Sequence, residues 1–297
     1  MSPNEADIGR HELGIFARTF PRASAAEVAA AVAAAGFGLV QLNLSAAGLP
    51  TLPGPAEQDG LDFGAIRRAF DDRAIRVWGV SASYNMIHPD PAVRDAQTEA
   101  AAALIGRAPE LGAAAVTLCT GSRDPDDMWR RHPGNDDPQA WKDLRVSLDR
   151  LLPAADAAGV RLGIEPEPGN VISTAGRARR LLDELGRDAG LTGIIFDPAN
   201  LVTVATAGRQ ADILAEAAGQ LAGWIFCLHA KDVVESGYAA AGTGRLDYAL
   251  IARLLAGLPD GVPLIAQDAA EDDVARVRGF LLAQAGPAGL RAPSPQP

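Results

Sequence analysis

The chain has 297 residues, 48% of them hydrophobic, which is enough apolar material for one large α/β domain or two smaller ones. Its 27 basic residues face 37 acidic ones, a formal net charge of −10, so we expect no nucleic-acid partner. The two cysteines, Cys119 and Cys227, lie in apolar runs, so we expect buried thiols and a reducing, cytoplasmic location.

The sequence carries no signal for secretion or for a membrane. The opening residues MSPNEADIGRHE have neither a cationic end nor an apolar stretch. The most apolar candidate span, VAAAVAAAGFGLV from Val28, is short and is broken by Gly36 and Gly38. Residues 286–297 are rich in Pro, Gly and Ala, so we expect a flexible C-terminal tail after a single domain of residues 1–285.

One pattern recurs along the chain: a short apolar run, a polar or glycine-rich break, and a helix-like stretch with apolar residues three and four apart. The apolar runs predict eight strands, at residues 13–17, 39–44, 75–81, 114–119, 160–165, 192–197, 223–229 and 262–267. The stretches after them predict eight helices, near residues 23–35, 62–73, 91–109, 138–157, 174–187, 207–219, 246–257 and 271–285.

Eight strand–helix units in fewer than 300 residues are the dimensions of a (β/α)8 barrel, or TIM barrel. Continuous apolar strands are typical of parallel sheets that are buried on both faces. An open doubly wound sheet also alternates strands and helices, but no G-x-G-x-x-G turn follows the first strand. We therefore predict a single-domain α/β barrel with its chemistry at the carboxyl ends of the strands.

The last four predicted strands each end on a residue that can bind a metal ion: Glu165, Asp197, His229 and Gln267. Their spacings of 32, 32 and 38 residues are close to one βα unit, so they occupy equivalent positions on consecutive strands. Carboxylates that share a partly buried pocket repel one another unless a cation compensates. Oxygen ligands with one imidazole suit Mn²⁺, Mg²⁺, Co²⁺ or Zn²⁺, so we predict one divalent ion. For any one of these residues alone, a capped or salt-bridged strand end is the alternative.

The chain resembles the sugar phosphate isomerase/epimerase superfamily of xylose isomerase-like TIM barrels over nearly its whole length. The resemblance rests on Glu165, Asp197 and His229 and on the segments HAKD, GTGRLDYALIARLL, YNMIHPD and CTGSRDPDDMWRRHP. Members hold one divalent cation with Glu, Asp, His and a second Glu, and move protons on a sugar. The resemblance therefore implies these three residues as ligands. The DNA-repair endonucleases of the superfamily fit poorly, because the chain is acidic and has only four histidines.

The sequence departs from the superfamily at the eighth strand, where Gln267 stands at the position of the second Glu. A Gln carbonyl still ligates a hard cation, but Gln cannot shuttle a proton. Glu167 is a spare carboxylate, on the same side as Glu165 if the backbone stays extended, and we predict that it binds substrate. Strand alternation sends the side chain of Asp268 to the opposite face, unless the strand has already ended.

Two residues in the loops after strands are further catalytic candidates. His88 follows the third predicted strand and is a candidate acid or base, with an ordinary loop histidine as the alternative. Lys231 is a candidate cation for a developing negative charge, with a salt bridge to Asp232 as the alternative.

Neutral and cationic side chains near the strand ends are candidates for substrate binding. Arg123 and His132 follow the fourth strand, in a loop where Trp129 offers an aromatic face to a polyol. Asn170 and Asn200 offer neutral hydrogen bonds at the rim of the barrel.

Three functions are compatible with these residues. The first is a metal-dependent isomerase or epimerase of a sugar or sugar-like polyhydroxy ketone or aldehyde, with an enediolate intermediate and Glu165 moving the proton. The second is a metal-dependent lyase or dehydratase on a keto-sugar or keto-cyclitol. The third is a non-catalytic sugar-binding or partner subunit, which Gln267 favours. The expected partner is a small sugar or polyol, and association into a homo-oligomer is left open.

Overall fold

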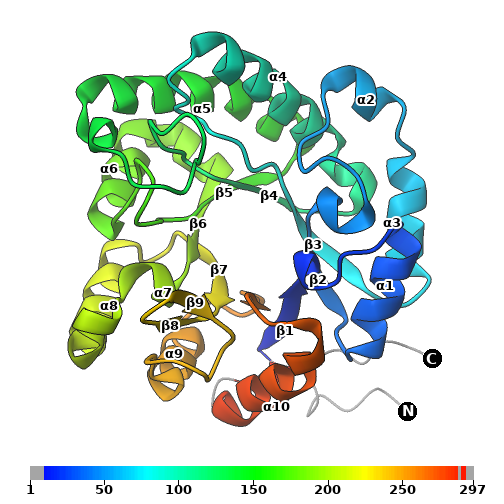
Figure 1. Ribbon diagram of the computed structural model, residues 1–297, viewed down its shortest axis with the longest axis vertical. Helices are drawn as coiled ribbons and strands as arrows, with labels where there is room; N and C mark the ends of the chain where they lie inside the picture. The colour runs from blue at the N-terminus through cyan, green and yellow to red at the C-terminus, as the bar shows by residue number, and fades with distance from the viewer. Residues whose placement is uncertain (1–9, 287–288, 292–297) are drawn as a thin grey trace.

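The computed structural model describes residues 10–286 and 289–291, and its centre is a closed barrel of eight parallel strands (Figure 1). β1 pairs with β2 on one side and with β10 on the other, with Leu13 opposite Leu264, and this second pairing closes the barrel. The predicted single-domain (β/α)8 fold is confirmed. The barrel strands are β1 (His11–Phe16), β2 (Leu39–Leu42), β3 (Arg76–Ser81), β4 (Ala115–Leu118), β5 (Arg161–Ile164), β6 (Thr192–Phe196), β7 (Ile225–Ala230) and β10 (Leu264–Ala266).

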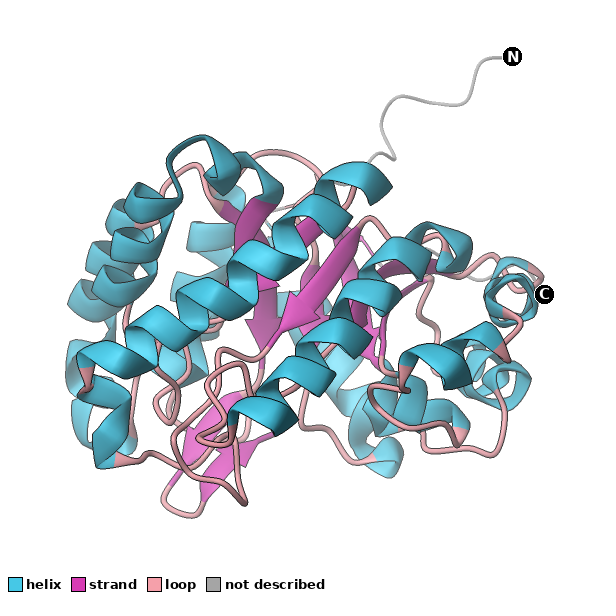
Figure 2. Cartoon of the chain, turned by 90° about the horizontal axis from the view of Figure 1, so that it is seen from above, coloured by secondary structure: helices cyan, strands magenta, loops and turns pink. Residues whose placement is uncertain are grey.

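Helices surround the barrel and connect its strands (Figures 1 and 2). Because all the pairings in the barrel are parallel, each connection must return along the outside of the sheet. The main helices are α1 (Ala25–Ala34), α3 (Phe63–Asp71), α4 (Pro91–Arg107), α5 (Pro138–Ala158), α6 (Ala175–Leu185), α8 (Gln210–Gln220), α9 (Tyr248–Ala256) and α10 (Val274–Gln284).

The strands are apolar because the barrel interior covers one face and the helices cover the other. β2, β4, β6 and β10 are buried along their whole length. Gly163 and Gly193 are register partners on β5 and β6. A Cβ at Gly163 would lie 2.8 Å from the Ile195 side chain, and one at Gly193 would lie 2.7 Å from the Phe226 ring. Glycine at these two positions therefore allows the Ile195 and Phe226 side chains to pack directly against the backbone of β5 and β6.

The structure adds short elements that the sequence pattern does not predict, because they are too short to show a periodicity. Two are the helices α2 (Pro55–Asp59) and α7 (Pro198–Leu201), and two more, β8 (Asp232–Val234) and β9 (Gly237–Ala239), form an antiparallel hairpin after β7.

The last short strand, β11 (Leu290–Arg291), pairs with the first residues of β1. It falls within the predicted C-terminal tail, which therefore contributes to the sheet. The rest of that tail after Gly286, residues 287–288 and 292–297, lies outside the described residues.

Two further findings concern the apolar segments of the chain. Over residues 10–286 and 289–291, the structure has no helix with the length and apolar character that a membrane crossing requires. Cys119 and Cys227 are both buried and form no disulfide, as expected from their apolar surroundings.

Candidate active site

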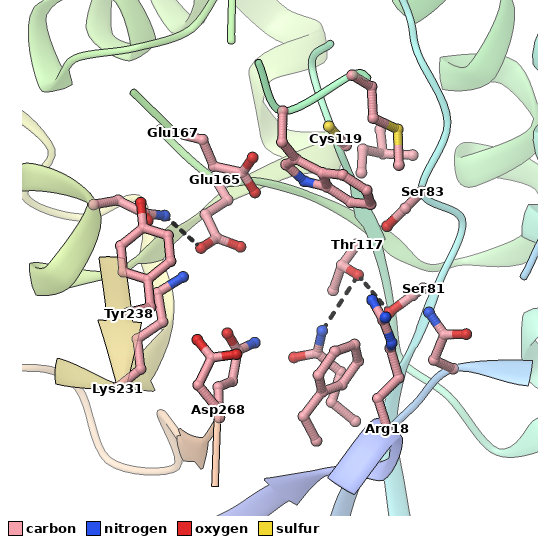
Figure 3. Close-up of a pocket in the computed structure, with 18 of the residues that line it drawn as sticks. Arg18, Ser81, Ser83, Thr117, Cys119, Glu165, Glu167, Lys231, Tyr238 and Asp268 are labelled. Carbon is pink, nitrogen blue, oxygen red and sulfur yellow. Dashed lines mark hydrogen bonds between the residues drawn. The ribbon is translucent and has the colours of Figure 1, made fainter. Parts of the chain in front are cut away.

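A cavity of about 710 Å³ opens at the carboxyl ends of the barrel strands (Figure 3). This volume is in the range of small-molecule sites. Each of the eight barrel strands, or the loop that follows it, contributes to the lining. The predicted site residues among the lining are Glu165, Glu167, Asn200, Lys231 and Gln267.

Glu165, Asp197 and His229 come together beside this cavity, at the ends of β5, β6 and β7. The three side chains are buried, and their ligand atoms all lie within 4.8 Å of one another. His229 Nδ1 lies 3.3 Å from Glu165 Oε2 and 3.9 Å from Asp197 Oδ2. This nitrogen is buried and makes no hydrogen bond to the described residues. A buried nitrogen that faces two carboxylates fits a metal ligand, so the three residues are suited to one divalent cation.

Two glutamines contact the other ring nitrogen of His229. Gln41 Oε1 lies 3.0 Å from His229 Nε2, and Gln267 Nε2 lies 3.2 Å from the same atom. Gln41 accepts a hydrogen bond when Nε2 carries the proton, whereas Gln267 donates one when Nε2 does not. Only the tautomer that is held by Gln41 leaves Nδ1 unprotonated for a metal. Gln267 contacts His229 through its nitrogen, so its role as a fourth ligand stays a prediction.

Lys231 is held in the wall of the cavity by an ion pair and an aromatic ring. Its Nζ lies 2.9 Å from Asp197 Oδ2 and 4.1 Å from the centre of the Tyr238 ring, on β9. The alternative partner, Asp232, instead accepts hydrogen bonds from backbone N–H groups of its own loop. Burial would lower the pKa of Lys231, but Asp197 and Glu165 raise it above its ordinary value, so the amine stays charged.

The carboxyl groups of Glu165 and Glu167 have opposite pKa shifts although they are two residues apart. Burial would raise the pKa of Glu165, but His229 and Lys231 hold it down, to about 2. Burial and the charge of Glu165 raise the pKa of Glu167 well above its usual value, and Lys231 offsets only part of this rise. Asn200 donates a hydrogen bond of 2.7 Å to Glu165 Oε1 and so orients the ionised carboxylate.

Asp268 also lines the cavity, although simple strand alternation sends it to the opposite face (Figure 3). β10 ends at Ala266, and Asp268 has a φ of 54°, in the left-handed region. Alternation applies only within an extended strand, so a left-handed residue after the strand end points elsewhere. The exception that the sequence leaves open therefore holds, and the cavity gains a further carboxylate.

Three loop residues that we predict to bind substrate are not part of the cavity lining. Arg123 forms an ion pair with Asp143 of α5. Asn170 uses both ends of its amide for hydrogen bonds to the backbone of the loop after β4. His132 accepts the N–H of Gly134, two residues further on. These side chains hold the loop in place and do not reach the cavity.

His88, the candidate acid or base, also lies away from the cavity lining. Its Nε2 lies 3.3 Å from the carbonyl oxygen of Pro125, and its Nδ1 accepts the N–H of Asp90 at 3.1 Å. Both ring nitrogens are therefore occupied by backbone groups, and the ring ties the loop after β3 to the loop after β4. The geometry gives His88 no direct part in the chemistry of the cavity.

The side of the cavity formed by β1 to β4 contains polar residues that the sequence analysis misses. Gln41 Nε2 donates to Thr117 Oγ1 at 3.5 Å, and Thr117 Oγ1 donates to Ser81 Oγ at 3.1 Å. Ser81 ends its apolar run, whereas Gln41 and Thr117 lie within theirs. A search for polar residues at the ends of the first four strands would therefore have found Ser81 but not the other two. The polar lining residues on this side are Arg18, Gln41, Asn43, Thr51, Ser81, Ser83 and Thr117.

A family model described as a xylose isomerase-like TIM barrel matches residues 29–283 of the chain. No protein of curated function matches the sequence.

Solved structures of sugar epimerases share the fold over almost the full length of the chain. YcjR, a 3-keto-D-glucoside 4-epimerase from E. coli, has a TM-score of 0.70 and 17% identity, covering 92% of this chain and 99% of its own. An L-ribulose 3-epimerase has a TM-score of 0.68 and 18% identity, covering 93% and 95%. D-allulose 3-epimerase from Methylomonas sp., in complex with D-allulose, has a TM-score of 0.68 and 16% identity, covering 94% and 99%. At these identities the likeness concerns the fold.

Proposed function

The chain belongs to the xylose isomerase-like TIM barrel family, and from this membership we propose that it is a divalent-metal-dependent sugar isomerase or epimerase. Its substrate would be a sugar or sugar-like polyhydroxy ketone or aldehyde. The observation that carries the proposal is the cluster of Glu165, Asp197 and His229 beside a cavity with polar walls. The shared fold of several sugar epimerases supports it.

Glu165, Asp197 and His229 would hold the ion, with Gln267 as the predicted fourth ligand. A divalent ion bound there, Mn²⁺, Mg²⁺, Co²⁺ or Zn²⁺, polarises substrate oxygens and acidifies the neighbouring C–H bond. The donor set of two carboxylates and one imidazole suits such ions. Lys231 limits the net negative charge of the cluster by pairing with Asp197.

In the proposed reaction, side chains in the cavity wall would move the proton. Glu165 lines the cavity in an orientation fixed by Asn200, so it can take a proton from the carbon next to the carbonyl group. Lys231 presents an ammonium group to the same space and stabilises the negative charge on the enediolate oxygen. Glu167, whose carboxyl group has a raised pKa, is a further group from which a proton can return to the carbon.

A metal-dependent lyase or dehydratase acting on a keto-sugar or keto-cyclitol is the second candidate function. Gln267 favours it, because this residue lines the cavity and its amide cannot return a proton. In such an elimination Glu165 takes the proton, the C–H electrons form the new double bond, and the β-oxygen leaves with its own bonding pair. No proton then has to come back to the carbon.

The test of both candidates uses the Mn²⁺-loaded protein with neutral ketoses and 3-keto-glycosides in deuterated water. We expect NMR to detect deuterium at the carbon next to the carbonyl group. An epimer or an aldose–ketose isomer identifies the first function, and an unsaturated ketone identifies the second. Treatment with a chelator should stop the exchange.

Two variants show whether the exchange occurs at the metal cluster. Glu165→Gln should lower the exchange rate by about 10²–10⁴-fold, the usual contribution of a positioned acid or base. His88→Ala removes a histidine outside the cavity lining and should leave the rate unchanged. A chain that binds no metal and exchanges no proton with any of these sugars would instead be the non-catalytic subunit.

A further inference from the structure

The cavity has two chemically different sides, and the proposed function uses only one of them. The carboxyl groups in its lining, Glu165, Glu167 and Asp268, follow β5 and β10. Strands β1 to β4 and their loops contribute no carboxylate to the lining. Figure 3 shows Arg18, which follows β1, extending into the cavity across from Glu165 and Lys231.

The guanidinium group of Arg18 makes no ion pair or hydrogen bond with the described residues. Most of the other arginines in the described part of the chain make at least one such contact. A guanidinium group offers five N–H donors in a planar fork that matches a carboxylate or a phosphate. An exposed arginine is usually satisfied by water, however, so Arg18 alone does not define a binding site.

Asn43 supplies an independent observation on the same side of the cavity. This residue lines the cavity but is only 2% exposed. Its Oδ1 accepts hydrogen bonds from the backbone N–H and the hydroxyl of Ser45, at 3.0 and 2.7 Å. These bonds fix the amide, so Nδ2 is the end left for the cavity, and it has no partner among the described residues. Asn43 therefore presents two fixed N–H donors.

Two hydroxyl groups add to these donors. Ser83 lines the cavity and has no side-chain hydrogen bond to the described residues. Ser81 Oγ accepts a hydrogen bond from Thr117, so its own proton remains available. We call the set of Arg18, Asn43, Ser81 and Ser83 the donor wall. Each of its four side chains has an unused donor, and Arg18 gives it a positive charge.

We propose that the donor wall binds an anionic oxygen group, a carboxylate or a phosphate ester, on the part of the sugar remote from the reacting carbon. The proposal rests on the proposed function for the reacting end and names the substrate class as acidic sugars. Charge-assisted hydrogen bonds to an anion are the strongest that such donors make. A neutral sugar would leave the charge of Arg18 unused.

The experiment measures sugar binding to the metal-free, chelator-treated protein, because a bound cation would itself attract anions. The probes are D-glucuronate, D-glucose 6-phosphate and neutral D-glucose, titrated with ligand-observed NMR. In this state the carboxylates on the opposite side repel anions, whereas the Lys231 ammonium group attracts them, so variants of the donor wall must show which side causes a preference for a charged probe. We expect at least one charged probe to bind at least ten-fold more tightly than D-glucose.

Three variants assign this preference to the donor wall. Arg18→Gln should reduce the affinity for the charged probe at least ten-fold and leave the affinity for D-glucose unchanged. Asn43→Asp keeps the acceptor for Ser45 but replaces the two donors with a charge that repels anions, so it should act in the same direction. The control Arg253→Gln makes the same charge change on an exposed position of α9 and should have no effect.

Each outcome of the titrations decides the matter. A preference for glucuronate identifies a sugar acid, and a preference for the phosphate ester identifies a sugar phosphate. Equal binding of all three probes, no binding of either charged probe, or an unaffected preference in Arg18→Gln would overturn the proposal. Deuterium exchange on neutral ketoses remains a separate test, so a donor wall that fails leaves the proposed proton transfer standing, and the reverse also holds.

Discussion

His229 shows how one side chain depends on a neighbour that is distant in sequence. Gln41 on β2 contacts its Nε2, although 188 residues separate the two. A hydrogen-bond acceptor at this nitrogen favours the proton there and leaves Nδ1 to face Glu165 and Asp197. The tautomer of His229 that suits the proposed metal site is therefore set by a residue that belongs to neither of the elements that carry Glu165 and Asp197.

The first prediction concerns this contact. Gln41→Leu removes the acceptor and should weaken Mn²⁺ binding about 10–100-fold, the usual effect of losing an outer-shell partner. Gln41→Glu keeps an acceptor and should retain the affinity. Isothermal titration calorimetry measures both. Nitrogen-15 NMR of the histidine ring reports the tautomer even without metal, so an unchanged His229 tautomer in Gln41→Leu would contradict the argument.

The sequence predicts the clustering of the three candidate metal ligands better than it predicts their surroundings. Glu165, Asp197 and His229 end three strands with a regular spacing, and a barrel fixes the position of a strand end. Gln41 lies within an apolar run, and its role appears only when β2 and β7 are placed around the same barrel. His88 is expected in the cavity but lies outside its lining. The position of a loop residue depends on contacts with distant segments, which no local sequence pattern encodes.

At the scale of elements, the outer helices fix the loops at the cavity mouth. Asp143 of α5 pairs with Arg123, from the loop after β4, and with Arg94 of α4. The strands and main helices are predictable because each has a local apolar pattern in the sequence. This ion-pair cluster is not predictable in the same way, because it joins two helices and a loop that are separate in the sequence. The arginine that we predict to bind substrate therefore acts as a support for the loop.

The second prediction concerns this cluster. Burial would raise the pKa of Asp143, but hydrogen bonds from Gln139 and Arg123, with the charge of Arg94, lower it below its ordinary value. The ionised group then stabilises the fold at pH values above its unfolded pKa, and this contribution is lost as the pH falls through the folded pKa. Asp143→Asn should lower the free energy of unfolding at pH 7 by about 2 kcal/mol, between the effects for exposed and buried pairs.

Urea unfolding at neutral and acidic pH tests this sign. The difference between wild type and Asp143→Asn should shrink as the pH falls from about 4, where the carboxylate of the unfolded chain takes up protons, through the lower pKa of the folded state. The same difference at every pH would mean that the charge of Asp143 does not stabilise the fold.

The third prediction concerns the packing of two loops. A Cβ at Gly169, after β5, would overlap the carbonyl oxygen of Trp129, in the loop after β4. Backbone must move to relieve such an overlap, so Gly169→Ala should lower the free energy of unfolding by about 1–3 kcal/mol and displace Trp129 in the cavity wall. Thermal unfolding and tryptophan fluorescence measure the two effects.

Gly106 in α4 provides the matched control, because a Cβ there would meet nothing within 4 Å. Gly106→Ala should not lower the free energy of unfolding, because the added methyl group meets no neighbour and alanine favours a helix more than glycine does. If both variants were equally stable, the loop contact would be too soft to hold Trp129.

At the scale of the whole molecule, the two ends of the barrel have different tasks. The cavity lies at the carboxyl ends of the strands, whereas β11 extends the sheet at the amino end of β1. Arg291 of β11 donates to Glu12 of β1 at 2.9 Å. The contacts between β11 and β1 therefore lie at the opposite end of the strand from the cavity.

The fourth prediction follows from this separation. A chain that ends at Gly286 loses β11 and should lose about 1 kcal/mol of stability, a fall in Tm of about 2–4 °C for a protein of this size. Its affinity for Mn²⁺ and its rate of proton exchange should stay unchanged. Calorimetry and the NMR exchange assay measure these quantities. A folded, truncated chain with a weaker metal site would show that the two ends are coupled.

The order of the strands around the barrel follows the order of the sequence, so the donor wall is encoded before Pro138 and the carboxylates after Ala158. If the two proposals hold, a genetic crossover within α5 would join the donor wall of one chain to the carboxylates of another. Such a hybrid would need a hydrogen-bond acceptor at the position of Gln41 in its first half, because Gln41 contacts Nε2 of His229 in the second half. New specificities are thus open to this architecture by recombination as well as by point mutation.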